Sequence, residues 1–343
     1  MIANKKFKIL SIDGGGLRGI IPLQVIKQIE AITGEPIHKS FDLIAGTSTG
    51  GLLACALTLN DNENIEGDTR KFTLEKIENI YKSRGNEIFS KRISSLTKWF
   101  KPQFKVDKFN DILVEFFGDN RITSCLRPLF ITSYNIHRNQ PIYFTTREAS
   151  MFIDKNSKLV EVCRATSAAP TYFESHKFQY ESENIVCIDG GIVMNNPAIG
   201  ALIEVLGNSD YKHYKIDDEI LKLSDITILS LGTGKVNKMM NSSDSKTWGR
   251  LKWIKPIIDI STSGPSKIAH QHIETIFQSS NLERNYLRID IDIDEKYSEM
   301  SDSKEKTINY LLKEANDQIT KNHTLNFKLK AFLENSGINV IEN

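Results

Sequence analysis

Apolar and polar residues change their spacing repeatedly within the first 60 residues of the chain. The short apolar run Phe7–Ile12 predicts a strand, and after a glycine-rich turn seven apolar residues recur at helical spacing: Ile20, Ile21, Leu23, Val25, Ile26, Ile29 and Ile32. A second apolar run at 41–45 is followed by another sharp turn and a helical stretch at 52–57. Two consecutive strand–loop–helix units predict a parallel sheet covered by helices.

Similar patterns continue along the rest of the chain. Further strands are expected at 128–136, 142–146, 185–188, 226–231 and 286–291, and helices at 74–82, 108–117, 159–168, 198–206, 265–278 and 304–319. Residues 235–256 are basic and irregular. Because we find no repeat and no linker-like stretch, we expect one α/β domain over 1–343, with its core at about 7–234 and a C-terminal helical elaboration at about 235–343.

Charge limits the possible partners. The 44 lysines and arginines balance 43 acidic residues, so the net charge of +1 gives no general attraction to a nucleic-acid polymer or an anionic membrane. Any lipid contact must therefore be local. Residues 82–108 hold eight basic against two acidic residues, with aromatic rings among the lysines: Trp99, Phe100, Phe104, Lys98, Lys101 and Lys105. This mixture suits a lipid surface, and the alternative is that the rings pack in the core.

The chain shows no sequence feature of a secreted or membrane-spanning protein. Its first residues lead into a strand without an apolar signal segment, and the most apolar long window, 43–59, is broken by glycines and hydroxyl residues. The four cysteines have no metal-ligand spacing and lie in apolar runs, which favours reduced thiols: Cys55, Cys125, Cys163 and Cys187. We therefore expect a cytoplasmic protein that makes peripheral contact with the membrane.

The strongest chemical signal is the turn Gly46-Thr47-Ser48-Thr49-Gly50, between the second strand and its helix. A serine in G-x-S-x-G at such a turn is a nucleophile elbow. Gly46 and Gly50 matter because a Cβ beside the serine would clash in the strained turn. The start of the following helix favours negative charge developing near Ser48. The alternative is a glycine-rich turn that only packs a strand against a helix.

A second glycine-rich turn, Gly14-Gly15-Gly16, follows the first strand directly. Consecutive glycines can aim several N–H groups at one point, and parallel strands would bring this loop beside Ser48 at the carboxyl edge of the sheet. It could then form an oxyanion hole for an acyl carbonyl. With Gly19 the loop also matches G-x-G-x-x-G of dinucleotide-binding folds. However, the second strand ends in the serine turn and not in the acidic residue that such a site requires.

Ser48 also needs a base to accept its proton. The chain has seven histidines, none in a setting that singles it out: His38, His137, His176, His213, His270, His272 and His323. Asp189 does stand out, because it leaves the apolar run 185–188 and precedes Gly190 and Gly191. Its carboxylate would lie at the same sheet edge as Ser48. The alternative for an isolated Asp-Gly-Gly is an Asx turn or the start of a helix.

Taken together, these motifs resemble the patatin-like phospholipases. Residues 13–19, 46–50 and 189–191 occur in the order and approximate spacing of that family, and residues 164–170 and 195–197 also look like it. The resemblance spans about 7–234 and is loose beyond that. It implies a three-layer α/β fold with a mainly parallel central sheet flanked by helices.

The resemblance also implies roles for single residues. Ser48 would be the nucleophile and Asp189 the base of a dyad without histidine, and Gly14, Gly15 and Gly16 would form the oxyanion hole. Arg18 would either fix the glycine loop or meet a lipid phosphate. The other supporting positions are Gly19, Gly46, Gly50, Gly190 and Gly191. No metal and no cofactor are implied.

The function implied is that of a lipid acyl hydrolase acting on membrane phospholipids. Two alternatives stay open: a soluble esterase or thioesterase with the same dyad, and a non-catalytic nucleotide-binding module that uses the glycine loop. Some compact bacterial members of the family are antiviral effectors activated by cyclic nucleotides, and this chain is similar to them in size and simplicity.

Overall fold

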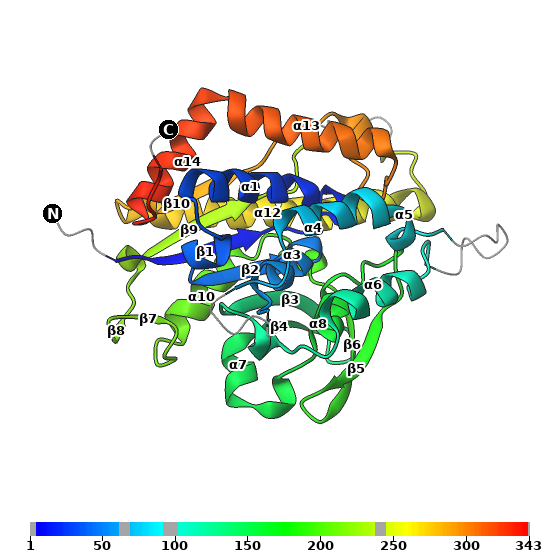
Figure 1. Cartoon of the computed structure of the whole chain (residues 1–343). Helices are drawn as coiled ribbons and strands as arrows, with labels where there is room; N and C mark the ends of the chain where they lie inside the picture. Colours follow the sequence, from blue (N-terminus) through cyan, green and yellow to red (C-terminus); the bar gives the residue numbers. More distant parts are fainter. Residues whose placement is uncertain (1–4, 62–68, 92–101, 237–244, 342–343) are drawn as a thin grey trace.

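The computed structural model describes residues 5–61, 69–91, 102–236 and 245–341, and its centre is a mainly parallel sheet flanked by helices (Figure 1). Five strands run parallel in the order β10-β9-β1-β2-β3. Their bounds are Phe7–Ile12 for β1, Leu43–Thr47 for β2, Leu129–Asn135 for β3, Ile226–Leu231 for β9 and Tyr286–Ile289 for β10. The expected α/β fold is confirmed.

Alternate residues of the central strands pack into two separate cores, one on each face of the sheet. Leu10 and Ile12 of β1 belong to the larger core, whereas Phe7 and Ile9 belong to the smaller one. Because successive strand side chains point to opposite faces, a nearly continuous apolar run is what a sheet covered on both faces requires. This explains why these strands were recognisable in the sequence.

Helices cover both faces of the sheet (Figure 1). The larger core includes residues of α1 (Ile20–Thr33), α3 (Thr49–Thr58), α4 (Leu74–Asn79), α6 (Asp107–Phe117), α8 (Leu159–Thr166), α13 (Glu305–Lys321) and α14 (His323–Asn335). The smaller core lies against α10 (Ala198–Gly207) and the second half of α12 (Arg250–Ser279). The remaining α-helices are short: α2 (Ile37–Ser40), α5 (Gly85–Ile88), α7 (Thr146–Met151) and α9 (Gly191–Met194).

Two strands run against the parallel set, β4 (Gln140–Thr145) and β6 (Glu183–Asp189), and each of them pairs with β3. At the edge of the sheet, β5 (His176–Tyr180) pairs antiparallel with β6 and so runs in the direction of the parallel set. One edge of β3 is occupied by β4 over residues 130–135, so β2 and β6 must share the other edge. Thr47 at the end of β2 pairs with Thr132, and Asp189 at the end of β6 pairs with the next residue, Ser133. The carboxyl ends of β2 and β6 therefore meet head to head along β3.

The C-terminal third differs from the expected helical elaboration in two ways. β10 joins the central sheet beside β9, so the sheet extends beyond residue 234. Helix α12 begins at Arg250 and continues through Pro256 and Pro265, although we expected an irregular stretch up to 256. Each proline removes one helical hydrogen bond, but α12 packs on α9 and α10, and this packing outweighs the local preference. That the whole chain forms one domain stays a prediction, favoured by the contact of α13 with α1.

None of the helices in the described ranges combines the length and the apolar character needed to cross a bilayer.

Candidate active site

Ser48 occupies a strained turn between β2 and α3. Its backbone angles, a φ of 54° and a ψ of −123°, lie outside the regions that residues other than glycine ordinarily adopt. A Cβ on Gly46 would overlap the backbone of Gly50, and one on Gly50 would overlap the Ile12 carbonyl of the neighbouring strand. The two flanking glycines are therefore what allows the turn to be this tight.

Asp189 reaches this serine from the opposite direction. Because β2 and β6 end against adjacent residues of β3, the Asp189 carboxylate lies beside the hydroxyl, and Ser48 Oγ donates a hydrogen bond of 2.7 Å to Asp189 Oδ2. The backbone N–H of Gly191 donates to the other carboxylate oxygen at 2.7 Å and fixes its orientation. We expected Asp189 at the end of an apolar strand, at the same sheet edge as Ser48. The strand is antiparallel, and its position comes instead from the head-to-head ends of β2 and β6.

The electrostatic setting suits Asp189 to accept a proton. Both partners are buried, with Ser48 9% and Asp189 5% exposed. Burial raises the pKa of Asp189 to about 6, while the hydrogen bonds from Ser48 and Gly191 act in the opposite direction. A carboxylate with this pKa is a better base than a solvated aspartate and is still ionised at neutral pH.

Thr166, at the end of α8, holds both halves of the site together. Its Oγ1 accepts the backbone N–H of Ser48 at 2.8 Å, and its carbonyl accepts the N–H of Gly190 at 3.3 Å. The neighbouring Ala168 carbonyl accepts the N–H of Asp189 at 3.0 Å. The loop after α8 therefore connects the serine turn to the aspartate turn.

The glycine loop lies next to the serine, but its three N–H groups are not equivalent. Gly14 donates its N–H to the carbonyl of Asn195 at 3.1 Å, so this group is already used. The N–H groups of Gly15 and Gly16 have no hydrogen-bond partner in the described part of the chain, and both residues line the same cavity as Ser48. The available loop donors are thus Gly15 and Gly16. The N–H of Thr49, which begins α3, is also without a partner among the described residues.

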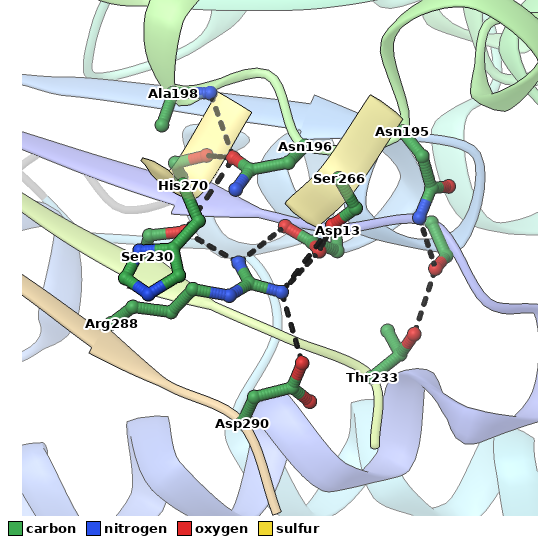
Figure 2. A network of polar contacts seen from close by, with 12 residues as sticks. Asp13, Asn195, Asn196, Ala198, Ser230, Thr233, Ser266, His270, Arg288 and Asp290 are labelled. Atoms are coloured by element: carbon green, nitrogen blue, oxygen red, sulfur yellow. Dashed lines mark hydrogen bonds and ion pairs between the residues drawn. The ribbon is translucent and has the colours of Figure 1, made fainter. Parts of the chain in front are cut away.

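A buried ionic network fixes Asp13, the residue before the glycine loop, and Figure 2 shows its members. Arg288 of β10 donates to Asp13, the residue before the loop, at 2.8 Å and to Asp290 at 3.0 Å. Burial disfavours the charged guanidinium, but the two carboxylates outweigh it and raise the pKa of Arg288. Ser266 of α12 donates to the same Asp13 carboxylate at 2.6 Å. Removal of one member of such a buried pair typically costs about 3–5 kcal/mol, so the network fixes both the loop and α12.

Arg18 and Gly19 lie at the start of α1. Arg18 is 9% exposed, and its guanidinium donates to the Gly234 carbonyl at 3.3 Å. Its backbone N–H donates to the Gly15 carbonyl at 3.2 Å. This position favours the structural role expected for Arg18 over a contact with lipid phosphate. Gly19 precedes α1 and lies against Thr49 and Tyr81.

A mostly apolar cavity of about 150 Å³ adjoins this site. Ser48, Asp189, Gly15 and Gly16 are part of its lining. Most of the remaining lining is apolar and comes from α3, the segment 77–89 and α6; it includes Leu52, Ile80, Phe89, Ile112 and Phe116. An apolar lining beside the dyad suits the first part of a fatty acyl chain whose carbonyl lies at Ser48.

Other sequence-based candidates lie elsewhere. None of the seven histidines lines the cavity, and His270, for example, contacts Tyr286 through Nδ1 at 2.9 Å. Within the described ranges, no group of histidine, cysteine or acidic side chains is arranged to hold a metal ion.

The expected lipid contact at 82–108 is not supported where the structure describes it. Phe104 is 1% exposed and packs against Phe89 and Phe173, so this ring belongs to the core. Residues 92–101, which include Trp99, Phe100, Lys98 and Lys101, lie outside the described residues.

The sequence did not identify several residues that position the site. Thr166, Asn195 and Thr233 act through hydrogen bonds that only the folded chain brings about. Thr166 and Asn195 lie in stretches already noted as family-like, 164–170 and 195–197, which was the available signal. No sequence signal pointed to Arg288.

Comparison with known proteins finds similar sequences over most of the chain. The sequence profile of the family described as Patatin-like phospholipase matches residues 10–202. The chain is 33% identical to Patatin-like protein 3 of Arabidopsis thaliana over 316 residues, covering 83% of this chain and 73% of the relative. It is 32% identical to Patatin-2-Kuras 3 of Solanum tuberosum over 300 residues, covering 82% of this chain and 75% of the relative. Among solved structures, VipD from Legionella pneumophila aligns with 91% of this chain and 67% of its own, at 11% identity and a TM-score of 0.36, which is too distant to bear on function.

Proposed function

The chain belongs to the patatin-like phospholipase family, a family of lipid acyl hydrolases, and we propose that it cleaves fatty acyl esters of membrane phospholipids with Ser48 and Asp189 as a catalytic dyad. The observation that carries this proposal is the 2.7 Å hydrogen bond from Ser48 Oγ to Asp189 Oδ2, two residues that line the apolar cavity. An ester carbonyl at that point would have its acyl chain in the cavity and its head group outside.

In the first half of the reaction, Ser48 Oγ attacks the ester carbonyl carbon and its proton passes to Asp189. Negative charge then develops on the carbonyl oxygen, where the free N–H groups of Gly15 and Gly16 stabilise it, with Thr49 as a further donor. The tetrahedral intermediate collapses, and the alcohol of the lysophospholipid leaves with the proton from Asp189. The acyl group stays on Ser48 as an ester.

In the second half, water attacks the acyl-serine and Asp189 accepts the proton of that water. The same N–H groups stabilise the second tetrahedral intermediate. Its collapse returns the proton to Ser48 and releases the fatty acid. One carboxylate thus serves as base and acid in turn, and the Gly191 N–H keeps it in place throughout.

This mechanism predicts a pH dependence set by Asp189. The carboxylate accepts a proton only when ionised, and burial raises its pKa to about 6. We therefore expect kcat/KM for a soluble ester to rise with pH through about 6 and to level off above it, because kcat/KM reports the free enzyme. An inflection near neutral pH that disappears on substitution of one histidine would contradict an aspartate base.

The proposed function is tested on vesicles of phosphatidylcholine and phosphatidylglycerol, with the released lipids identified by mass spectrometry. We expect fatty acid and lysophospholipid from the wild type and neither from Ser48→Ala. Hydrolysis of a soluble chromogenic ester without vesicle hydrolysis would indicate the soluble esterase instead. Binding of a dinucleotide with no hydrolysis of either substrate would indicate the nucleotide-binding module.

Activation by a cyclic nucleotide and a role in antiviral defence remain predictions from the family resemblance. A cleft of about 620 Å³ at the amino edge of the sheet is lined by several cations. However, Lys5 pairs with Asp217 at 2.6 Å and Lys8 with Asp42 at 3.0 Å, so the cleft does not by itself indicate an anion site. Addition of a panel of cyclic nucleotides to the vesicle assay measures this directly.

A further inference from the structure

The first part of α12 carries a row of apolar side chains that face solvent. Ile254, Ile257, Ile260 and Ile268 are 44%, 53%, 47% and 51% exposed. A single exposed isoleucine is ordinary, but several on one helix form a continuous surface that in a water-soluble protein needs a partner. Ile254, Ile257 and Ile268 are spaced by 3 and 11 residues, which places them on one side of the helix.

This surface continues around the helix to the catalytic cavity. Ile258 and Thr262 of α12 line the cavity that holds Ser48. At 3.6 residues per turn, Ile258 lies about 40° around the helix from Ile254, and Thr262 about 40° further. The methyl group of Thr262 lies 3.7 Å from where a Cβ would stand on Gly191, whose N–H holds Asp189. One helix thus has its outer face towards solvent and its adjoining face towards the candidate dyad.

The residues around this row indicate the kind of partner. The rings of Trp248 and Trp253 contact each other at 5.1 Å, and Lys252 lies 5.5 Å from the centre of the Trp248 ring. Lys246, Lys252 and Lys267 are exposed. The only acidic residue in the sequence 245–268 is Asp259, whose charge acts on the buried Arg18. Isoleucines, tryptophans and lysines with almost no acidic residue are the composition of a surface that lies on an anionic bilayer.

We propose that the outer face of α12, formed by Ile254, Ile257, Ile260 and Ile268 with Trp253 and Lys267, docks the protein on an anionic phospholipid bilayer. This rests on the proposed function, because a lipid hydrolase must take its acyl ester out of a bilayer. Docking here brings the lipid surface against the helix that also lines the catalytic cavity, so the bilayer and the cavity lie on adjoining faces of one helix. A second copy of the chain on this face would instead separate the helix from the lipid.

The test compares two pairs of exposed apolar residues. The test pair is Ile254→Ser with Ile257→Ser. The control pair is Met151→Ser with Ile153→Ser, whose side chains are 57% and 84% exposed. Neither residue of the control pair lines the catalytic cavity, and α7 lies at the start of β3, where Thr146 accepts the N–H of Leu129. Both pairs remove similar apolar groups from the surface.

Binding is measured by sedimentation with vesicles of equal parts phosphatidylcholine and phosphatidylglycerol, in the inactive Ser48→Ala background so that the lipid stays intact. We expect the α12 pair to weaken vesicle binding at least about tenfold and the control pair to leave it unchanged. In the active protein, the α12 pair should lower vesicle hydrolysis by a similar factor and leave kcat/KM for a soluble ester within about twofold. Lys267→Glu, a second variant, should weaken binding mainly at low salt.

The proposal would be overturned if the α12 pair bound vesicles as tightly as the Ser48→Ala protein without further changes. It would also be overturned if the α12 pair and the control pair lost vesicle binding to the same extent. Conversion of a dimer to a monomer by the α12 pair in size-exclusion chromatography, with vesicle binding unchanged, would assign the surface to a second copy instead. These outcomes are distinct from a failure of the proposed function, in which the wild type binds the vesicles but releases no fatty acid.

Discussion

Ser48→Ala and Asp189→Asn are each expected to lower hydrolysis of both vesicle phospholipid and soluble ester by at least about 10³-fold. Ser48→Ala removes the attacking oxygen. In the wild type, Ser48 Oγ lies 2.7 Å from the Asp189 carboxylate. Asp189→Asn keeps the size of this side chain, but an amide cannot accept the proton of the serine. Because both groups act in one proton-transfer step, the double variant should be scarcely less active than either single variant.

Stability measurements separate this loss of activity from unfolding. The pKa of Asp189 is raised to about 6, above the value near 3.9 of an exposed aspartate, so the folded state binds the proton more tightly than the unfolded state. The tighter binding of this proton stabilises the folded state at low pH, and that contribution to the free energy of unfolding is lost as pH rises from about 4 to 6. Asp189→Asn should therefore increase the free energy of unfolding at neutral pH, by up to about 2–3 kcal/mol, in urea titrations.

Substitution of the histidines is the control for the dyad. Each of the seven, replaced in turn by Gln or Asn, should leave substantial activity, because none lines the cavity around Ser48. If a histidine variant were folded but as inactive as Ser48→Ala, that histidine would belong to a catalytic triad and the dyad would be wrong.

Gly15→Ala is expected to lower kcat by about 10²–10³-fold with little change in KM, which is the typical effect of losing an oxyanion donor. A Cβ on Gly15 would overlap the side chain of Thr233, whose hydroxyl donates to the Gly14 carbonyl at 2.7 Å. The loop must then shift, and its N–H groups no longer point to the position of the oxyanion. Since that charge exists only along the reaction path, the loss falls on turnover and not on binding.

The matched control is Gly207→Ala, because a Cβ there meets no atom within 4 Å in the described structure. This variant should keep wild-type kinetics. A second variant, Thr233→Gly in the Gly15→Ala background, relieves the overlap and should recover part of the lost turnover. If Gly15→Ala raised KM alone, and equally for all substrates, the loop would be a binding element and not an oxyanion hole.

The parts of the fold that could be predicted from the sequence are those where one local signal dominates. The run Phe7–Ile12 and the helix α1 were recognisable because a strand buried on both faces and an amphipathic helix differ in hydrophobic period. Ser48 was recognisable because Gly46 and Gly50 mark a turn that few other structures need.

The remaining features depend on contacts between distant segments. The direction of β6 is decided by its pairing with β3, and nothing in residues 183–189 distinguishes an antiparallel from a parallel strand. The hydrogen bond from the Gly14 N–H to the Asn195 carbonyl connects two residues that are 181 positions apart in the sequence. Helix α12 passes through two prolines because of its packing on α9 and α10, which local preferences could not indicate.

The central claim, that Ser48 is a nucleophile activated by Asp189 without a histidine, is tested most directly with a fluorophosphonate probe, which reacts with activated serines. The modified residue is identified by peptide mass spectrometry, and the labelling rate is compared among the wild type, Asp189→Asn and the seven histidine variants. We predict a single adduct on Ser48, formed at a similar rate in every histidine variant and at least about 10²-fold more slowly in Asp189→Asn. An adduct on another residue, or labelling of Asp189→Asn at the wild-type rate, would contradict the account.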